Sequence, residues 1–433
     1  MRFIVRGGKP LRGEVKLAGA KLSAPKLMVA TLLTEEPCTL YNFPAIGDTS
    51  ITVELCEKIG TKFSVRGGVA TLHTPEIKQS RVTELSRRNR IPILAMGPLL
   101  ARTGEAEVPI LGGDKIGPRP VNFHLEAFRA LGAEVETTPQ SYIARAPQGL
   151  HGALIEFPFP SVTATESCVL AAVLAKGETV IRNAALEPEI VSMVKMLQNM
   201  GAIIEFGAHR DIHIEGVPRL RGAAHEIIPD RNEAVSFACL AIATGGEILV
   251  RGAVQEHLIT FLNVVRRLGA EYKVVSGGIT FIRLNSLKAI SIETGTHPGF
   301  MTDWQQPLAV LLTQAGGISY IHETIWEDRF AYAEDLRMLG ANIEVGMECP
   351  PGRECRFARK GLKHTAVIKG PSELKGDGKT LRVRDLRAGM IDVTAALVSK
   401  GETKIEGVEE IDRGYERIDE RLRRLGADIT REV

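Results

Sequence analysis

The chain has 433 residues, which exceeds one ordinary hydrophobic core and favours two domains of about 200 residues each. It carries 54 Lys and Arg against 52 Asp and Glu, and this balance argues against a nucleic-acid-binding or membrane-surface protein. The N-terminal residues lack the apolar core of a secretory signal, and no apolar run is long enough to span a membrane. We therefore expect a soluble, cytoplasmic protein.

A pattern of about 70 residues recurs along the chain. In each copy an apolar residue, a glycine and a small residue end a predicted helix, and the six glycines are Gly60, Gly132, Gly201, Gly269, Gly340 and Gly426. A second glycine precedes five of them by 24 to 28 residues, at Gly104, Gly177, Gly245, Gly316 and Gly401. Because glycine accepts the left-handed backbone that stops a helix, each copy predicts an apolar helix, a strand, an amphipathic helix and a pair of strands.

Six copies of this length make two groups of three, which predicts a pseudo-symmetric, two-domain α/β protein with its ligand enclosed between the lobes. The longest interval contains residues 348–379, which are rich in Gly, Pro, Lys and Arg and are predicted to form a loop insertion. Within it, Cys349 and Cys355 flank Pro-Pro-Gly-Arg-Glu. They could form a disulfide or half of a metal site, although a plain turn is favoured because no second pair of ligands lies nearby in the sequence.

Residues 111–121 read Leu-Gly-Gly-Asp-Lys-Ile-Gly-Pro-Arg-Pro-Val. The glycines and prolines exclude a helix interior and a central strand, so the segment is predicted to be a loop able to move. Asp114, Lys115 and Arg119 place one candidate proton carrier beside two cations. The segment is either a solvated surface loop or a loop that closes over an anion.

Other charged residues stand near the ends of predicted elements. Lys21 begins a predicted helix, Arg90 precedes another, and Asp303 precedes a third. Further examples are Arg329, residues 384–387 and residues 412–413. A solvated salt bridge explains any one of them, but together they favour a shared anionic ligand.

Several motifs are specific enough to suggest a family. They are Gly19-Ala-Lys21, residues 95–102, residues 112–120, residues 183–190, Pro229-Asp-Arg231, residues 297–303, Asp385-Leu-Arg387 and residues 411–417. With these motifs the sequence resembles the enolpyruvyl transferases, and among them the branch acting on UDP-N-acetylglucosamine in peptidoglycan synthesis. The resemblance covers essentially the whole chain apart from the insertion around Cys349 and Cys355. The sister branch acting on shikimate 3-phosphate has Gly-Asn-Ala-Gly-Thr before the position of Ala95, which this chain lacks.

The resemblance implies an inside-out α/β barrel pair with six βαβαββ repeats in two pseudo-threefold lobes. One lobe would comprise residues 1–20 and 230–433, and the other residues 21–229 with the mobile loop 111–121. The implied reaction transfers the enolpyruvyl group of phosphoenolpyruvate to the 3-hydroxyl of UDP-N-acetylglucosamine and releases phosphate. It implies no metal and no organic cofactor, and it leaves the oligomeric state open.

The matching motifs also imply residue roles. Asp303 would accept or orient the proton of the sugar hydroxyl, Asp114 would protonate the methylene carbon of phosphoenolpyruvate, and Asp385 would position the neighbouring arginines. The cations that would hold phosphate and carboxylate are Lys21, Arg90, Arg119, Arg329, Arg387 and Arg413. The remaining substrate contacts would be Leu22, Pro120, Val121, Asn122, Ser161, Val162, Thr163 and Ile325.

Three positions depart from the family pattern. Asp114 stands where cysteine is most common, so we expect retained activity and insensitivity to epoxides that alkylate the loop thiol. Leu22 replaces an asparagine, and Asn122 replaces an aspartate that reads uracil. Two alternatives therefore stay open: transfer to another uridine nucleotide, and a catalytically silent paralogue that binds a nucleotide sugar. Retention of the arginines and Asp303 argues against the silent paralogue.

Overall fold

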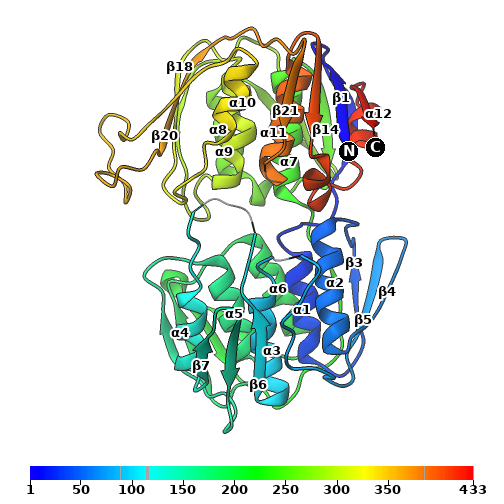
Figure 1. Ribbon diagram of the computed structural model, residues 1–433, viewed down its shortest axis with the longest axis vertical. Helices are drawn as coiled ribbons and strands as arrows, with labels where there is room; N and C mark the ends of the chain where they lie inside the picture. Colours follow the sequence, from blue (N-terminus) through cyan, green and yellow to red (C-terminus); the bar gives the residue numbers. More distant parts are fainter. Residues whose placement is uncertain (88, 114–116, 385, 433) are drawn as a thin grey trace. The chain divides into compact units, whose positions relative to one another are not determined.

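The computed structural model describes residues 1–87, 89–113, 117–384 and 386–432. The chain has a two-domain α/β fold and divides into two compact units, many of whose elements are labelled in Figure 1. Unit 1 consists mainly of Met1–Ala18 and Pro229–Val433, and unit 2 mainly of Gly19–Gly113 and Arg119–Ile228.

Within the described residues, unit 1 contains three four-stranded sheets, ordered β15-β16-β14-β2, β17-β18-β20-β19 and β21-β22-β1-β23. In each sheet one strand pair is parallel, namely β2 with β14, β17 with β18, and β21 with β22, and the other pairs are antiparallel. The strands are β1 (Arg2–Arg6), β2 (Arg12–Lys16), β14 (Glu247–Arg251), β15 (Glu271–Val275), β16 (Gly278–Ile282), β17 (Ser291–Glu293), β18 (Gly317–His322), β19 (Asn342–Gly346), β20 (Thr365–Gly370), β21 (Lys379–Arg382), β22 (Glu402–Glu406) and β23 (Asp428–Glu432). The helices are α7 (Arg231–Ala243), α8 (Ile259–Arg267), α9 (Gln305–Leu312), α10 (Tyr332–Met338), α11 (Leu386–Val398) and α12 (Ile418–Arg424).

Unit 2 repeats this plan with sheets ordered β13-β3-β5-β4, β6-β8-β7 and β11-β12-β10-β9 among its described residues. Its strands are β3 (Cys38–Tyr41), β4 (Lys62–Arg66), β5 (Val69–His73), β6 (Glu105–Pro109), β7 (Glu134–Thr137), β8 (Ser141–Arg145), β9 (Leu154–Glu156), β10 (Glu178–Arg182), β11 (Ile203–Phe206), β12 (Ile212–Glu215) and β13 (Ala224–Glu226). Its helices are α1 (Ala24–Ala30), α2 (Gly47–Ile59), α3 (Pro92–Thr103), α4 (Asn122–Ala130), α5 (Val162–Ala172) and α6 (Pro188–Asn199).

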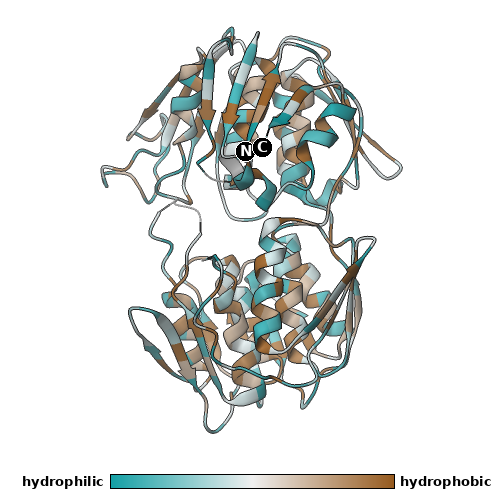
Figure 2. Ribbon diagram, turned by 45° about the vertical axis from the view of Figure 1, so that its right-hand side comes forward, coloured by the Kyte–Doolittle hydropathy of each residue, from teal (hydrophilic) through white to brown (hydrophobic). Residues whose placement is uncertain are grey.

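The first helix of each repeat forms the core, and the sheets lie outside it. Every residue of α1, α7 and α9 is buried, including polar residues such as Lys26, Arg231 and Gln305, so these helices are enclosed on all sides. In unit 1, α9 packs against both α7 and α11, and in unit 2, α3 packs against α5. The outer strands alternate instead: in β14, Ile248 and Val250 are buried while their neighbours reach solvent. Figure 2 shows this change between hydrophilic and hydrophobic residues along the strands.

The glycine pattern predicted from sequence is confirmed. All six glycines that end the second helix of a repeat have positive φ. At Gly201 (φ +104), the glycine N–H donates to Gln198 O and Ala202 N–H donates to Leu197 O, both at 2.9 Å. These bonds close the last turn of α6, whose residues Ile190, Met193, Val194 and Leu197 are buried along one face. The predicted amphipathic second helix is therefore present.

The prediction that residues 348–379 form a loop insertion is wrong for part of this range. Residues Thr365–Gly370 form β20, which lies between β18 and β19 and pairs with both. The apolar run at 366–368 is short and is flanked by lysines, so the overall polarity of the segment hid a central strand. The connection between β19 and β20 is the part without regular structure.

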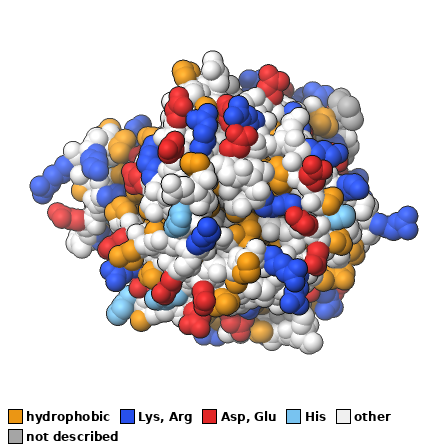
Figure 3. All heavy atoms as spheres, turned by 90° about the horizontal axis from the view of Figure 1, so that it is seen from below, with side chains coloured by type: hydrophobic (Ala, Val, Ile, Leu, Met, Phe, Trp, Pro, Cys, Tyr) orange, Lys and Arg blue, Asp and Glu red, His pale blue; other side chains and the backbone are white. Residues whose placement is uncertain are grey.

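The described surface is mixed in charge. On the face shown in Figure 3, acidic and basic side chains are interspersed, in keeping with the net charge of +2. Among the described residues, no helix combines the length and apolar character needed to cross a bilayer.

Candidate active site

Lys21 lies in unit 2 just before α1, at the end of the Gly19-Ala-Lys21 motif. A Cβ on Gly19 would lie 2.1 Å from Asn42 O, so the chain can pass here only with glycine. The Lys21 Nζ is 3.0 Å from Asp48 Oδ2 in the first turn of α2, and both side chains are largely buried. This pair holds the ammonium group in one place, as a binding residue requires.

Arg90 and Arg119 approach each other in unit 2. Arg90 precedes α3, and its Nη1 donates a hydrogen bond of 3.0 Å to the backbone O of Arg119. Arg119 has a positive φ of 47°, which is uncommon for a residue with a side chain. Burial, and then the neighbouring Arg119 charge, lower the pKa of Arg90 to about 10. The side chain is still a cation at neutral pH, and a bound anion would relieve the repulsion between the two guanidinium groups.

Two segments predicted to contact substrate, residues 120–122 and 161–163, meet through His124. Its Nδ1 lies 2.8 Å from Ser167 Oγ, and its Nε2 lies 3.2 Å from Thr163 Oγ1. Burial, and then the charge of Arg90, lower the pKa of His124 to about 3, so the ring is neutral. The start of α4, with the exposed Asn122, is thereby joined to the start of α5 with Thr163. Pro120 and Val121 precede α4, and Ser161 and Val162 begin α5.

Leu22 is anchored by its backbone, and its side chain is partly exposed. Its carbonyl oxygen accepts a hydrogen bond from Lys26 Nζ, which also lies 3.2 Å from Glu166 Oε1. Lys26 and Glu166 are both buried. The Leu22 side chain thus presents an apolar group where the family has an amide.

Asp303 lies in unit 1, in the short 3₁₀ helix Thr302–Trp304 that leads into α9. Arg329 Nη2 donates to Asp303 Oδ1 at 2.6 Å, and Asn232 Nδ2 donates to Asp303 Oδ2 at 3.3 Å. Trp304 Nε1 in turn donates to Asn232 Oδ1 at 2.9 Å. Both oxygens of the carboxylate therefore have donors that fix its orientation.

No predicted motif included Glu323, although its buried carboxylate organises this region. It accepts hydrogen bonds from Thr302 Oγ1 (2.8 Å) and Gln305 Nε2 (2.6 Å), and from the backbone N–H groups of Ile325 (2.7 Å) and Trp326 (3.0 Å). Glu323 thus ties the segment that carries Ile325 and Arg329 to the one that carries Asp303. A glutamate directly after an apolar strand was the available signal.

Arg413 also lies in unit 1, at the end of the 3₁₀ helix Val408–Arg413. It is buried, and its Nη1 is 2.9 Å from Glu410 Oε2. Asp114, Asp385 and the side chain of Arg387 lie outside the described residues. The structure therefore brings together Arg90 with Arg119 and Asp303 with Arg329, while contact of each predicted residue with a substrate stays a prediction.

Two units of helix-centred βαβαββ repeats are the fold of the enolpyruvyl transferases. The family described as EPSP synthase (3-phosphoshikimate 1-carboxyvinyltransferase) matches residues 5–422, and the chain belongs to this family.

The chain is also similar to individual proteins of known sequence and structure. The chain is 45% identical to a UDP-N-acetylglucosamine 1-carboxyvinyltransferase of Protochlamydia amoebophila, over 98% of this chain and 93% of the relative. It is 46% identical to the protein of the same name from Chlamydia pneumoniae, over 97% of this chain and 92% of the relative. Among solved structures, the enolpyruvyl transferase NikO of Streptomyces tendae has a TM-score of 0.87 at 23% identity, covering 99% of this chain and 98% of that chain. EPSP synthase of Acinetobacter baumannii has a TM-score of 0.72 at 18% identity, covering 99% of this chain and 100% of that chain. These two structures bear on the fold alone.

Proposed function

We propose that the chain transfers the enolpyruvyl group of phosphoenolpyruvate to the 3-hydroxyl of UDP-N-acetylglucosamine and releases phosphate, the first committed step of peptidoglycan synthesis. The observation that carries this proposal is identity of 45–46% over nearly the full chain with two relatives of that name. The cations and the carboxylate described above supply the chemistry that this reaction needs. A cytoplasmic location is part of the proposal.

The reaction is an addition followed by an elimination. The sugar hydroxyl oxygen bonds to C2 of phosphoenolpyruvate while its proton leaves, and C3 gains a proton. Phosphate then departs from C2 as C3 loses a proton, which restores the double bond. The protein must therefore hold a phosphate and a carboxylate, accept a proton from oxygen and give one to carbon.

Arg90 and Arg119 are proposed to bind the phosphate and the carboxylate of phosphoenolpyruvate. Planar guanidinium groups bind phosphate and carboxylate through two parallel hydrogen bonds. The contact with the Arg119 backbone engages Arg90 Nη1, and we expect other N–H groups of Arg90 to bind the anion. Lys21, fixed by Asp48, adds a point charge.

Asp303 is the proposed proton acceptor for the sugar hydroxyl. A carboxylate oxygen keeps lone pairs after accepting one hydrogen bond, so each oxygen held by Arg329 or Asn232 can still approach a hydroxyl. Asp114 is the proposed donor to C3. We expect epoxides that alkylate thiols to leave the enzyme active, and rapid inactivation by such an epoxide would contradict this assignment.

A second candidate keeps the reaction and changes the acceptor to another uridine nucleotide. It is favoured by Leu22, whose partly exposed side chain cannot make the hydrogen bonds of an amide. Phosphate release from phosphoenolpyruvate, measured with a panel of uridine nucleotides, separates the candidates. Turnover with UDP-N-acetylglucosamine supports the first, turnover only with another nucleotide supports the second, and no turnover with any acceptor supports a silent paralogue.

A further inference from the structure

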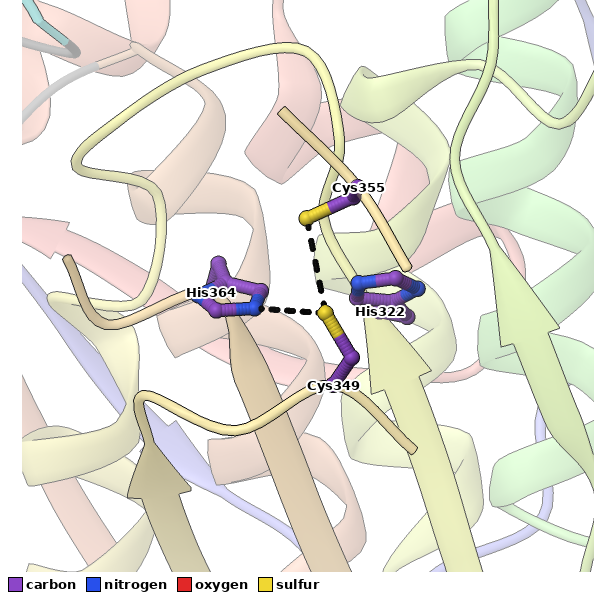
Figure 4. A group of neighbouring side chains, drawn as sticks. All are labelled: His322, Cys349, Cys355 and His364. Atoms are coloured by element: carbon purple, nitrogen blue, oxygen red, sulfur yellow. Dashed lines mark hydrogen bonds between the residues drawn. The ribbon is translucent and has the colours of Figure 1, made fainter. Parts of the chain in front are cut away.

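Four side chains of types that can ligate a metal ion meet in unit 1. Cys349 and Cys355 lie in the connection between β19 and β20, while His322 ends β18 and His364 directly precedes β20. One ligand atom from each residue can be chosen so that all four lie within 4.8 Å of one another. Figure 4 shows the two thiols and the two imidazole rings turned toward a common point. The sequence placed the cysteines near each other but gave no sign that two distant histidines would join them.

The distances match a tetrahedral metal site better than a disulfide. The two sulfur atoms are 3.7 Å apart, and Cys349 Sγ is 3.3 Å from His364 Nε2. Tetrahedral zinc, with Zn–S of about 2.3 Å and Zn–N of about 2.0 Å, separates two sulfurs by about 3.8 Å and a sulfur from a nitrogen by about 3.5 Å. A disulfide would require about 2.05 Å between the sulfurs, and both thiols are free.

Outer hydrogen bonds orient both histidines for coordination through Nε2. His364 Nδ1 donates to the backbone O of Leu362 at 2.7 Å. His322 Nδ1 donates to Glu293 Oε2 at 2.8 Å, and the same carboxylate oxygen accepts a bond of 3.0 Å from Arg353 Nη1. A carboxylate or carbonyl behind the imidazole is the usual support of a metal-bound histidine, because it fixes the tautomer and the ring orientation.

The hydrogen bonding of His322 Nε2 is a second, independent observation. The side chain is fully buried, and among the described residues this nitrogen has no hydrogen-bond partner. Leaving such a buried polar atom unsatisfied costs about 1–3 kcal/mol. One ring nitrogen of His322 faces the thiols in Figure 4, so a metal ion at the common point would satisfy it.

We propose that His322, Cys349, Cys355 and His364 bind one Zn²⁺ ion in a closed, structural site. Two thiolates and two imidazoles are the ligand set that zinc favours, and four protein ligands leave no position for a reactive water. The ion would fasten the connection between β19 and β20 to the end of β18. This inference does not depend on the enzymatic reaction.

The connection that carries the two cysteines also contacts the segment of residues 324–327. Arg356, next to Cys355, donates from Nε to Thr324 O at 3.1 Å and also bonds to Ile325 O. It lies 3.6 Å from Glu327 Oε1 as well. The zinc-bound connection therefore supports the segment that carries Ile325 and Arg329. A contribution to substrate binding follows from this contact, and that part rests on the proposed function.

Metal analysis of the full-length protein, purified without chelator and in the presence of reductant, tests the proposal directly. We expect about one zinc per chain in the parent protein and in Cys239→Ala, which removes a buried thiol of α7 outside the cluster. We expect zinc near background in Cys349→Ser, Cys355→Ser and His364→Ala. Circular dichroism of each variant verifies that the secondary structure is retained.

Cobalt provides a second readout that does not depend on stability. After exchange into Co²⁺, the parent protein should show the visible bands of tetrahedral cobalt and a thiolate-to-cobalt charge-transfer band, and Cys349→Ser should lose much of the latter. Failure of the parent protein to bind zinc or cobalt, or a Cys349–Cys355 disulfide in the reduced preparation, would overturn the proposal. Zinc binding by a protein that turns over phosphoenolpyruvate with none of the tested acceptors would instead support the zinc site and contradict the proposed function.

Discussion

Two pairs of charged residues, one in each unit, differ in how their charges are compensated. In unit 1, Asp303 and Arg329 form a salt bridge of 2.6 Å, and Asn232 holds the second carboxylate oxygen. In unit 2, Arg90 contacts the backbone of Arg119, and burial together with that like charge lowers the pKa of Arg90 to about 10. A satisfied carboxylate is suited to hold one orientation during proton transfer, whereas two neighbouring cations are suited to receive an anion.

Two buried glutamates, Glu323 of unit 1 and Glu166 of unit 2, differ in how fully their carboxylate oxygens are hydrogen-bonded. Glu323 of unit 1 accepts four hydrogen bonds. Glu166 of unit 2 lies 3.2 Å from Lys26, while its second oxygen has no hydrogen-bond partner among the described residues. We infer that Glu323 positions its neighbours, whereas Glu166 is a source of pH dependence.

The largest effect is expected for Asp303→Asn. The amide cannot accept the sugar proton, so kcat should fall by about 10²- to 10⁴-fold, the usual contribution of a positioned general base. Phosphate-release kinetics measure the loss. The exposed Asp328→Asn, in the same segment as Arg329, is the matched control and should keep the parental kcat. A normal rate for Asp303→Asn would remove this residue from the chemistry.

Arg90→Gln should mainly weaken phosphoenolpyruvate binding. Loss of a charge-assisted contact worth about 1.5–3 kcal/mol corresponds to about a 10- to 150-fold rise in KM for this substrate. Arg90→Lys keeps the charge and loses the planar geometry, so it should lie between the parent and Arg90→Gln. Equal KM values for all three proteins would show that the Arg90–Arg119 pair does not receive the anion.

Glu323→Gln should lower the stability of the folded protein and loosen the segment that contains Ile325 and Trp326. The amide NH₂ group would face donors that now bind a carboxylate oxygen, which should lower the free energy of unfolding by about 1–3 kcal/mol. Hydrogen exchange at the backbone N–H groups of Ile325 and Trp326 should become faster. Urea unfolding and exchange mass spectrometry measure the two effects, and unchanged protection at both amides would rule out the positioning role.

A smaller, pH-dependent effect is expected for Glu166. Burial, opposed by Lys26, raises the pKa of Glu166 to about 7. The folded protein therefore retains a proton that the unfolded chain releases above its ordinary carboxyl pKa, so this group makes the free energy of unfolding fall as the pH rises toward 7. Glu166→Gln should reduce that slope in urea titrations, whereas the exposed Glu156→Gln should not. An identical slope in Glu166→Gln and the parent would contradict the assignment.

The fold was largely predictable because its information is local and repeated. Glycines such as Gly201 and Gly426 end helices at regular intervals. The largely apolar helices between them indicate a buried core. Strand β20 was missed because its short apolar run lies in a polar segment. Local patterns therefore identified the repeats but failed where composition masked one strand.

The candidate site was predictable only in part. Motifs identified Arg90, Arg119, Asp303 and Arg329 as residues of interest, but the structure was needed to show which of them touch. Glu323 and the four-residue metal cluster were out of reach for a physical reason. Glu323 meets Thr302 and Gln305 from a distant helical segment, and the histidines meet cysteines of the connection between β19 and β20, so no spacing in the sequence records these contacts.

The proposed enolpyruvyl transfer to UDP-N-acetylglucosamine is tested most directly by carrying out the reaction in D₂O. The chain is incubated with phosphoenolpyruvate and UDP-N-acetylglucosamine, and the product is analysed by mass spectrometry and NMR. Addition and elimination predict a 3-enolpyruvyl ether of the nucleotide sugar that carries deuterium in its vinyl methylene group. Absence of this product from UDP-N-acetylglucosamine, or its formation without any deuterium, would contradict the account.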